Sequence, residues 1–333
     1  MNEKIIYCKK RAGPLYCGLS GIYGDKQLAE ELIGLIGGTG LGEALIEKIK
    51  DVKFHSVDTP FGRPSDMILV GKMGKIRVAF INRHGRGHKL SPSEVPYAAN
   101  IFALKKLGAH AVIATGAVGS LRQSIRPGDL VIVSQFIDKT FRRQGSFFAG
   151  YGAVHCEMSE PVCGRLSRII GTTATKLDVR THRGGTYVCM EGPQFSTRAE
   201  SLMHKGWGGD LIGMTAMPEA KLAREAQVCY ALIAIVSDYD CWRIRPFEHT
   251  QGGQAHRGRP QRRKDKQELL REIIGNMQRA SENCLKLIEA TLAGRHGLAR
   301  EDCGCRRSLD LAVWTNQKEI TAGERKKVAV LFE

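Results

Sequence analysis

The chain lacks features that define several large protein classes. Its longest uninterrupted apolar run, residues 228–236, is nine residues long, whereas a membrane-spanning helix needs about 20. The first thirteen residues contain lysines but no apolar stretch with a small-residue cleavage site, so no secretory signal is predicted. The ten cysteines include no Cys-x-x-Cys pair with the spacing of a zinc site. We therefore expect a cytoplasmic protein without a membrane partner or a metal.

Most of the cysteines lie within apolar or helical segments. Such positions favour buried thiols in a reducing compartment over a disulfide framework, and they are Cys156, Cys163, Cys189, Cys229, Cys241 and Cys284. Cys303 and Cys305 differ because they flank a single glycine near the C-terminus. A disulfide between them would close a small, strained ring. Two free thiols are thus the expected state there, and a redox pair is the alternative.

Acidic residues are scarce relative to basic ones, 34 against 50, which gives a net charge of +16. Residues 243–271 alone contain nine Lys or Arg and three acidic residues, so this stretch supplies six of the sixteen excess charges (9 − 3). Within it, residues 245–264 are Gly-rich and are interpreted as a flexible basic insert. A charge run of this kind is more often a solvated loop than a nucleic-acid site, so a nucleic-acid-binding protein is the less favoured alternative.

Short apolar runs alternate with helical segments from residue 33 onward. Most runs lack alternation, which is typical of strands buried on both faces; they are residues 33–36, 76–82, 111–115, 129–136, 186–190 and 228–237. Helices are predicted over residues 93–107, 218–227 and 265–293. The pattern predicts one α/β domain, 33–295, with a mixed, mostly parallel twisted sheet flanked by helices. Residues 1–32 are expected to be a poorly ordered extension, and 296–333 a C-terminal tail.

Ligands in such folds bind at the carboxyl ends of the strands, and two predicted strands end in loops suited to an anion. Gly37-Gly38-Thr39-Gly40 can direct backbone N–H groups toward an oxyanion, although a plain tight turn is an equal alternative. Arg83-His84-Gly85-Arg86-Gly87-His88 follows another strand and favours phosphate binding. A metal site at the two histidines is disfavoured, because glycines interrupt any helix and no carboxylate lies nearby.

Two further strand ends carry small or acidic residues. Thr115-Gly116-Ala117-Val118-Gly119-Ser120 would by itself indicate only close backbone packing. Asp238 and Asp240 follow the most apolar strand and, two residues apart on extended backbone, point to the same side. Burying such acids is costly unless they are paired. The pair is therefore interpreted as a functional site, for a metal ion or for the hydrogen-bonding edge of a purine.

Five motifs in order along residues 33–242 together resemble the trimeric purine nucleoside phosphorylase family, and within it the members that act on 5′-methylthioadenosine. The motifs are Gly37-Gly38-Thr39-Gly40, Arg83-His84-Gly85-Arg86, Glu191-Gly192-Pro193-Gln194-Phe195-Ser196, Gly213-Met214-Thr215 and Asp238-Tyr239-Asp240-Cys241-Trp242. The resemblance implies a nucleoside phosphorylase-like fold, a homotrimer, and phosphorolysis of 5′-methylthioadenosine to adenine and 5-methylthioribose 1-phosphate. Inorganic phosphate would be the co-substrate, without a cofactor or metal. A phosphorylase for 6-oxopurine nucleosides is the alternative within this class.

The resemblance also implies residue roles. Phosphate would be held by Thr39, Arg83, His84, the backbone of Gly116 and Ala117, and Thr215. The nucleoside would contact Phe195, Ser196, Met214, Asp238 and Asp240, together with His155 reaching in from a neighbouring subunit. Asp238 and Asp240 would be the catalytic pair, with the pKa of Asp238 raised by burial so that it donates to purine N7.

The sequence departs from the family pattern at two places that matter for the substrate. Gly116 stands where several relatives have a hydroxyl residue facing phosphate, so only backbone can make that contact. The basic insert displaces a segment that closes the 5′ pocket in relatives, which leaves the selectivity for a methylthio group open.

Overall fold

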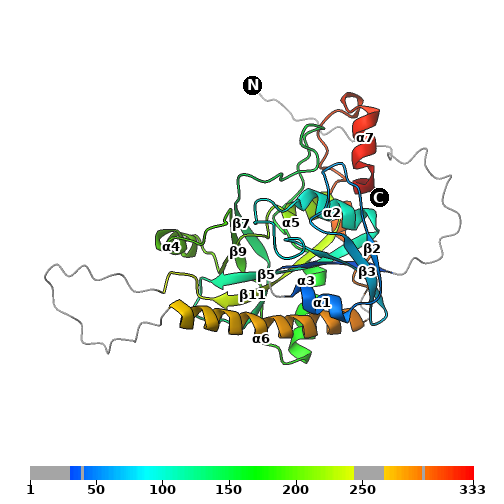
Figure 1. Ribbon diagram of the computed structural model, residues 1–333. Helices are drawn as coiled ribbons and strands as arrows, with labels where there is room; N and C mark the ends of the chain where they lie inside the picture. The colour runs from blue at the N-terminus through cyan, green and yellow to red at the C-terminus, as the bar shows by residue number, and fades with distance from the viewer. Residues whose placement is uncertain (1–30, 39–40, 244–265, 295–296) are drawn as a thin grey trace, which may run out of the picture. The chain divides into compact units, whose positions relative to one another are not determined.

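Two long apolar strands, β5 (Ala109–Ser120) and β11 (Cys229–Asp238), lie parallel and side by side at the centre of the protein. They belong to an eleven-stranded sheet in the computed structural model, which describes residues 31–38, 41–243, 266–294 and 297–333 (Figure 1). The described residues form one unit, Glu31–Glu333. Most of the N-terminal extension, Thr39 and the basic insert lie outside the described residues.

The remaining strands extend the sheet around this central pair. Its main path runs β2-β3-β4-β1-β5-β10-β9-β7, while β11 pairs with β5 and β6, and β6 with β8. Most of the pairs are parallel, which confirms the predicted mixed sheet. The strand bounds are β1 Leu32–Gly37, β2 Lys50–His55, β3 Ile68–Met73, β4 Ile76–Asn82, β6 Leu130–Ile132, β7 Gln135–Lys139, β8 Thr181–Arg183, β9 Thr186–Met190 and β10 Leu211–Gly213.

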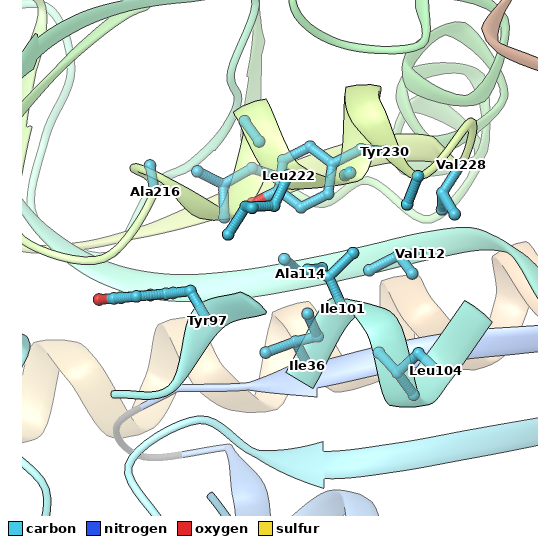
Figure 2. Packing of buried hydrophobic residues seen from close by; sticks show 14 of the residues in the cluster. Ile36, Tyr97, Ile101, Leu104, Val112, Ala114, Ala216, Leu222, Val228 and Tyr230 are labelled. Atoms are coloured by element: carbon cyan, nitrogen blue, oxygen red, sulfur yellow. The ribbon is translucent and has the colours of Figure 1, made fainter. Parts of the chain in front are cut away.

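The central strands are buried on both faces, because successive side chains of a strand point to opposite sides. Val112 and Ala114 of β5 pack into one hydrophobic core, whereas Ala111 and Ile113 pack into a second core on the other face. In the first core, helices α2 (Tyr97–Lys106) and α5 (Glu219–Glu225) cover the sheet, as Figure 2 shows. This two-sided burial explains why the strand sequences lack polar alternation.

The opposite face is covered by α1 (Gly42–Lys48), α3 (Gly164–Lys176) and the long helix α6 (Lys266–Ala293), which runs along β5 and β11 in Figure 1. The fully buried apolar side chains of helix α6 are Ala280, Cys284, Leu287, Ile288 and Leu292. They recur at helical spacing, so the apolar stripe read from the sequence is the face that packs on the sheet. Helix α4 (Arg198–Gly206) lies between β9 and β10 in the chain and does not contribute to this core.

The structure differs from the predicted elements at two places for clear physical reasons. Residues 129–136 form two short strands, β6 and β7, because the chain leaves the edge of β11 and joins β9 instead. Helix α2 begins at Tyr97, four residues later than predicted, because Pro96 at its N-cap disfavours helical backbone in the residue before it. The short elements α1, α3, α4, β2, β3, β8 and β10 were not predicted.

Residues 297–333 pack against the domain rather than extending from it as a tail. They form η1 (Gly304–Arg307), η2 (Gln317–Glu319), α7 (Ala322–Val328) and η3 (Ala329–Phe332). Leu331 and Leu309 belong to the core beside α2 and α5, and Leu298 belongs to the core beside α6. Sequence reasoning missed this because the buried residues are too widely spaced to form a periodic pattern.

The eight cysteines in the described residues are all free thiols. Cys163, Cys189, Cys229 and Cys284 are buried as predicted, whereas Cys156 and Cys241 are only partly buried.

Truncation of Leu331 tests whether the C-terminal segment is part of the core. Its side chain is fully buried, so Leu331→Ala should lower the free energy of unfolding by about 2–5 kcal/mol. Leu177→Ala, at a position that is 40% exposed, is the matched control and should change it by about 0.5 kcal/mol or less. Equal urea midpoints for the two variants would show that the segment does not contribute to the core.

Candidate active site

The carboxyl ends of β1, β4, β5 and β11 meet at one edge of the sheet. Gly37 at the end of β1 is in register with Asn82 of β4, and Asp238 at the end of β11 is in register with Gly119 of β5. The four loops that the sequence singled out therefore leave the sheet beside one another, as expected for parallel strands.

The turn after β1, which contains Gly38, lies against the loops that follow β4 and against the end of β5. The Gly38 amide donates to Thr115 Oγ1 over 3.3 Å. A Cβ at Gly38 would lie 2.9 Å from Arg83 Nη1 and 3.3 Å from the Gly116 Cα, so only a glycine allows this approach. Three of the predicted phosphate loops thus converge, although Thr39 itself is outside the described residues.

Arg83 is fully buried in the structure and forms a two-point ion pair with Glu219 at the start of α5. Its Nε donates to Glu219 Oε2 over 2.7 Å, and its Nη2 donates to Oε1 over 2.9 Å. Tyr230 donates to the same carboxylate over 2.8 Å. Burial opposes the charge, yet the adjacent Glu219 raises the pKa of Arg83 above its ordinary value. The arginine therefore stays charged, with Nη1 directed at the Thr115 carbonyl and the Gly38 turn.

Glu219 was not found by sequence reasoning. It is separated from Arg83 by 136 residues, and a glutamate in the first turn of a helix is ordinary in sequence. Its near-complete burial is what identifies it as the counter-charge of the site.

His84 is neutral at ordinary pH. Burial and the adjacent Arg83 lower its pKa to about 4. Its Nδ1 lies 2.8 Å from the Leu90 carbonyl, which can only accept, so Nδ1 carries the proton and Nε2 is left as an acceptor. Its ring stacks on His88 at 4.2 Å between centroids.

Gly116 and Thr215 face each other across the sheet edge. A Cβ added at Gly116 would lie 3.4 Å from Thr215 Oγ1, which is ordinary contact distance. The Thr215 amide donates to the Tyr187 hydroxyl over 3.3 Å. The structure therefore places the backbone of Gly116 and Ala117 beside the Thr215 hydroxyl and close to the Gly38 turn.

A second buried ion pair, Arg143 with Glu191, holds the loops on the other side of the site. Arg143 Nη1 donates to the carbonyls of Met214 and Met217, each over 2.6 Å, while Nε donates to Glu191 over 3.1 Å. Burial alone would raise the pKa of the Glu191 carboxyl. Hydrogen bonds from Ser93 and from the Phe141 amide, together with the charge of Arg143, outweigh burial and lower this pKa to about 2. Arg143 was also missed, because an arginine in a loop, here next to Arg142, carries no signal without its distant partner.

The loop after Glu191 approaches Met214 closely. Gly192 has φ +70, and a Cβ there would lie 2.6 Å from the Met214 sulfur. Both the left-handed backbone and the close contact require glycine at this position.

Asp238 and Asp240 lie together at the end of β11. Asp238 accepts from the Ser237 hydroxyl and from the Asp240 amide, both over 2.6 Å. Asp240 has φ +49, a strained conformation that non-glycine residues adopt chiefly at functional sites. Burial, together with the Asp238 carboxylate, raises the pKa of the Asp240 carboxyl. Among the described residues its Oδ2 is buried and has no hydrogen-bond partner.

The remaining predicted residues lie at different distances from this carboxyl pair. Ser196 approaches it, because its carbonyl accepts from the Cys241 thiol over 3.3 Å. Phe195 on the same loop is 86% exposed. His155 lies against the C-terminal segment: its amide donates to Ala312, and its ring meets Trp314 edge-on at 4.9 Å. His155 is therefore exposed on the surface and is not packed among the other predicted site residues.

No helix within the described ranges is both long and apolar enough to cross a membrane. The mostly parallel α/β sheet brings glycine turns, a buried arginine and a carboxyl pair together at its strand ends. The chain belongs to the phosphorylase superfamily, whose family model matches residues 32–293. It is thus an enzyme of the purine nucleoside phosphorylase type.

Relatives with similar sequences and structures narrow the class. The S-methyl-5′-thioadenosine phosphorylase of Cereibacter sphaeroides is 46% identical over 286 residues, which cover 85% of this chain and 91% of the relative. A methylthioadenosine phosphorylase from an antarctic soil metagenomic library has a TM-score of 0.78 at 36% identity, covering 91% of this chain and 99% of that one. A mutant adenosine/methylthioadenosine phosphorylase of Schistosoma mansoni in complex with methylthioadenosine has a TM-score of 0.69 at 30% identity, covering 91% and 98%.

Replacement of Glu219 tests the buried ion pair. Glu219→Gln leaves the Arg83 charge buried without a counter-charge, so the free energy of unfolding should fall by about 3–5 kcal/mol. Asp310→Asn, which breaks an exposed pair with Arg307, is the control and should cost about 1 kcal/mol or less. Urea unfolding at one fixed protein concentration measures both. A Glu219→Gln variant as stable as the Asp310→Asn variant would contradict this role of the pair.

Proposed function

We propose that this protein cleaves 5′-methylthioadenosine with inorganic phosphate, giving adenine and 5-methylthioribose 1-phosphate. The observation that carries the proposal is the spacing of two unlike subsites along β5. The anion-suited loops converge at Gly116, and the carboxyl pair lies against Gly119. Three residues of extended strand span about 10 Å, which is the length of a ribose held between a phosphate and a purine. The methylthio group of the proposed substrate is inferred from the relatives, which are named methylthioadenosine phosphorylases.

The phosphate subsite is built from one fixed charge and several neutral donors. Arg83 provides the positive charge, the Gly116 and Ala117 backbone lies beside it, and the Thr215 hydroxyl donates. His84, neutral with Nε2 as an acceptor, accepts a hydrogen bond from the hydroxyl of a hydrogen phosphate ion. Thr39 belongs to this subsite on the strength of the family resemblance. The subsite holds phosphate against C1′, and such positioning can supply a large share of the rate.

In the reaction a phosphate oxygen bonds to C1′ as the C1′–N9 bond breaks, and the electron pair passes into the purine. The leaving base gains electron density at N7, where a carboxyl proton from the aspartate pair stabilises it. Asp240 is the member of the pair with the raised pKa, whereas the sequence had favoured Asp238 for this property. Asp238, whose oxygens accept from Ser237 and from the Asp240 amide, orients its neighbour and accepts from the purine N6 amino group. The reaction consumes phosphate as a co-substrate and needs no cofactor.

The other substrate contacts follow from the loops that frame the site. Met214, whose carbonyl Arg143 holds, lies under the ribose, and Ser196 borders the base. The exposed Phe195 stacks on the purine. His155 serves the site of a neighbouring subunit in a homotrimer, and exposed apolar side chains beside it, Leu311 and Trp314, are suited to such an interface.

Light scattering of the protein in solution should give the mass of three chains.

Phosphate dependence is the direct test of the reaction. With 5′-methylthioadenosine, adenine should appear only when phosphate is supplied, because the subsite at Gly116 is suited to hold a phosphate oxygen against C1′. Chromatography of the products should show adenine and 5-methylthioribose 1-phosphate in equal amounts. Base release at the same rate in phosphate-free buffer would show that the reaction is hydrolysis and not phosphorolysis.

The carboxyl pair predicts a preference for 6-aminopurines. A carboxylate accepts from the adenine N6 amino group but repels the O6 of hypoxanthine, whereas an asparagine amide can donate to O6. Asp238→Asn should therefore shift the ratio of kcat/KM for methylthioadenosine over methylthioinosine at least about tenfold toward the 6-oxopurine, since a wrongly paired buried hydrogen bond costs about 1–3 kcal/mol. Asp310→Asn is the control for the same chemical change at the surface. An unchanged ratio in Asp238→Asn would remove the aspartates from base recognition.

A further inference from the structure

Four cysteine thiols from three distant parts of the chain meet on the face of the sheet opposite α2. Cys163 is the N-cap of α3, Cys229 is the first residue of β11, and Cys303 and Cys305 flank Gly304 at η1. All four Sγ atoms lie within 4.8 Å of one another. We refer to these four residues as the thiol cluster. Three of them are buried, and Cys303 is partly exposed, which leaves a route from solvent.

The separations suit a shared metal ion better than bonded pairs. The Cys163 and Cys303 sulfur atoms are 3.8 Å apart. Sulfurs at about 2.3 Å from a tetrahedral zinc ion are separated by about 3.8 Å from one another, whereas a disulfide requires about 2.05 Å. The Cys163–Cys303 separation therefore matches that of two ligands of a tetrahedral ion, and none of the four sulfur atoms is more than 4.8 Å from another.

The surroundings of the cluster are arranged for negative charge. Arg165 directs Nη2 to Cys229 Sγ, and Arg224 directs Nη1 to Cys305 Sγ, each over 3.9 Å. The Leu166 amide, in the first turn of α3, donates to Cys163 Sγ over 3.5 Å. A divalent ion with four thiolates carries a net charge of about −2, which two arginines balance. Four neutral thiols would not need these partners.

We propose that the thiol cluster is a structural binding site for one thiophilic divalent metal ion, with Zn²⁺ as the preferred ion. Soft thiolate ligands in a tetrahedral set select zinc-type ions over Mg²⁺ or Ca²⁺. Binding replaces four S–H bonds with four metal–sulfur bonds and releases four protons to solvent. All four positions are filled by protein, so the ion has no open position for catalysis.

The thiol cluster includes none of the residues proposed for phosphorolysis. A metal ion bound there would anchor the C-terminal segment. Two ligands come from that segment, which Arg165 also holds through the carbonyls of Gly297 and Leu298. The same segment contacts His155. A bound ion would tie it to α3 and β11, which are separated from it by long stretches of chain.

The test uses the full chain, freed of any affinity tag and reduced under anaerobic conditions, titrated with Co²⁺ alone. The wild type should bind about one equivalent and develop thiolate-to-cobalt charge-transfer bands with the visible bands of a tetrahedral ion, and added Zn²⁺ should abolish them. This measurement needs no variant and does not depend on activity. A reduced wild type that takes up no cobalt would overturn the proposal.

A matched pair of variants locates the ligands. Cys303→Ala should lower bound metal at least about tenfold, because three thiolates hold zinc less well than four. Cys284→Ala removes a buried thiol of the same hydrophobic core and should keep the wild-type spectrum. Wild-type spectra in both variants would place the metal elsewhere and refute the site. Disulfides among the four residues, in a chain that binds no metal after reduction, would identify redox pairing instead.

Discussion

The ion pair between Arg83 and Glu219 is the constraint on which the site depends. A charge that is fully removed from water must have its partner at a fixed distance, so the end of β4 and the start of α5 cannot move apart. Thr215 and Met214 lie in the short loop before α5, so the pair limits how far they can move. Arg143 and Glu191 repeat this arrangement on the opposite side. The loops at this edge of the sheet are thus fixed by buried charges rather than by apolar packing alone.

The central strands provide the second constraint. Alternate residues of β5 and β11 pack into two separate cores, which leaves no freedom to shift their register, because a slip by one residue would exchange the two faces. The positions of Gly116 and Gly119 relative to Thr215 and Asp238 follow from that register. The spacing between the anion-suited loops and the carboxyl pair is consequently a property of the sheet itself.

Sequence reasoning found what is local and missed what is assembled from distant parts. Residues 76–82 and 186–190 were predicted as strands with the bounds observed, because each is a mostly apolar segment between turns. The glycine turns, Arg83 and the aspartate pair were found because they follow such runs directly. Glu219 and Arg143 gave no signal, and of the thiol cluster only Cys303 and Cys305 stood out, since each of these groups acquires its meaning from a partner far away in the chain. Cys163 and Cys303, for example, are 140 residues apart, and no motif spacing can express that relationship.

The order of the strands has a consequence for synthesis. β5 ends at Ser120, but its parallel partner β11 begins only at Cys229, so a chain emerging from the ribosome presents β5 with an open, apolar edge for a long interval. Open edges of this kind are templates for pairing between chains, and parallel partners that are distant in sequence close slowly. The nascent polypeptide therefore passes through a period in which it is most vulnerable to aggregation, and protection by a chaperone would matter most before β11 is made.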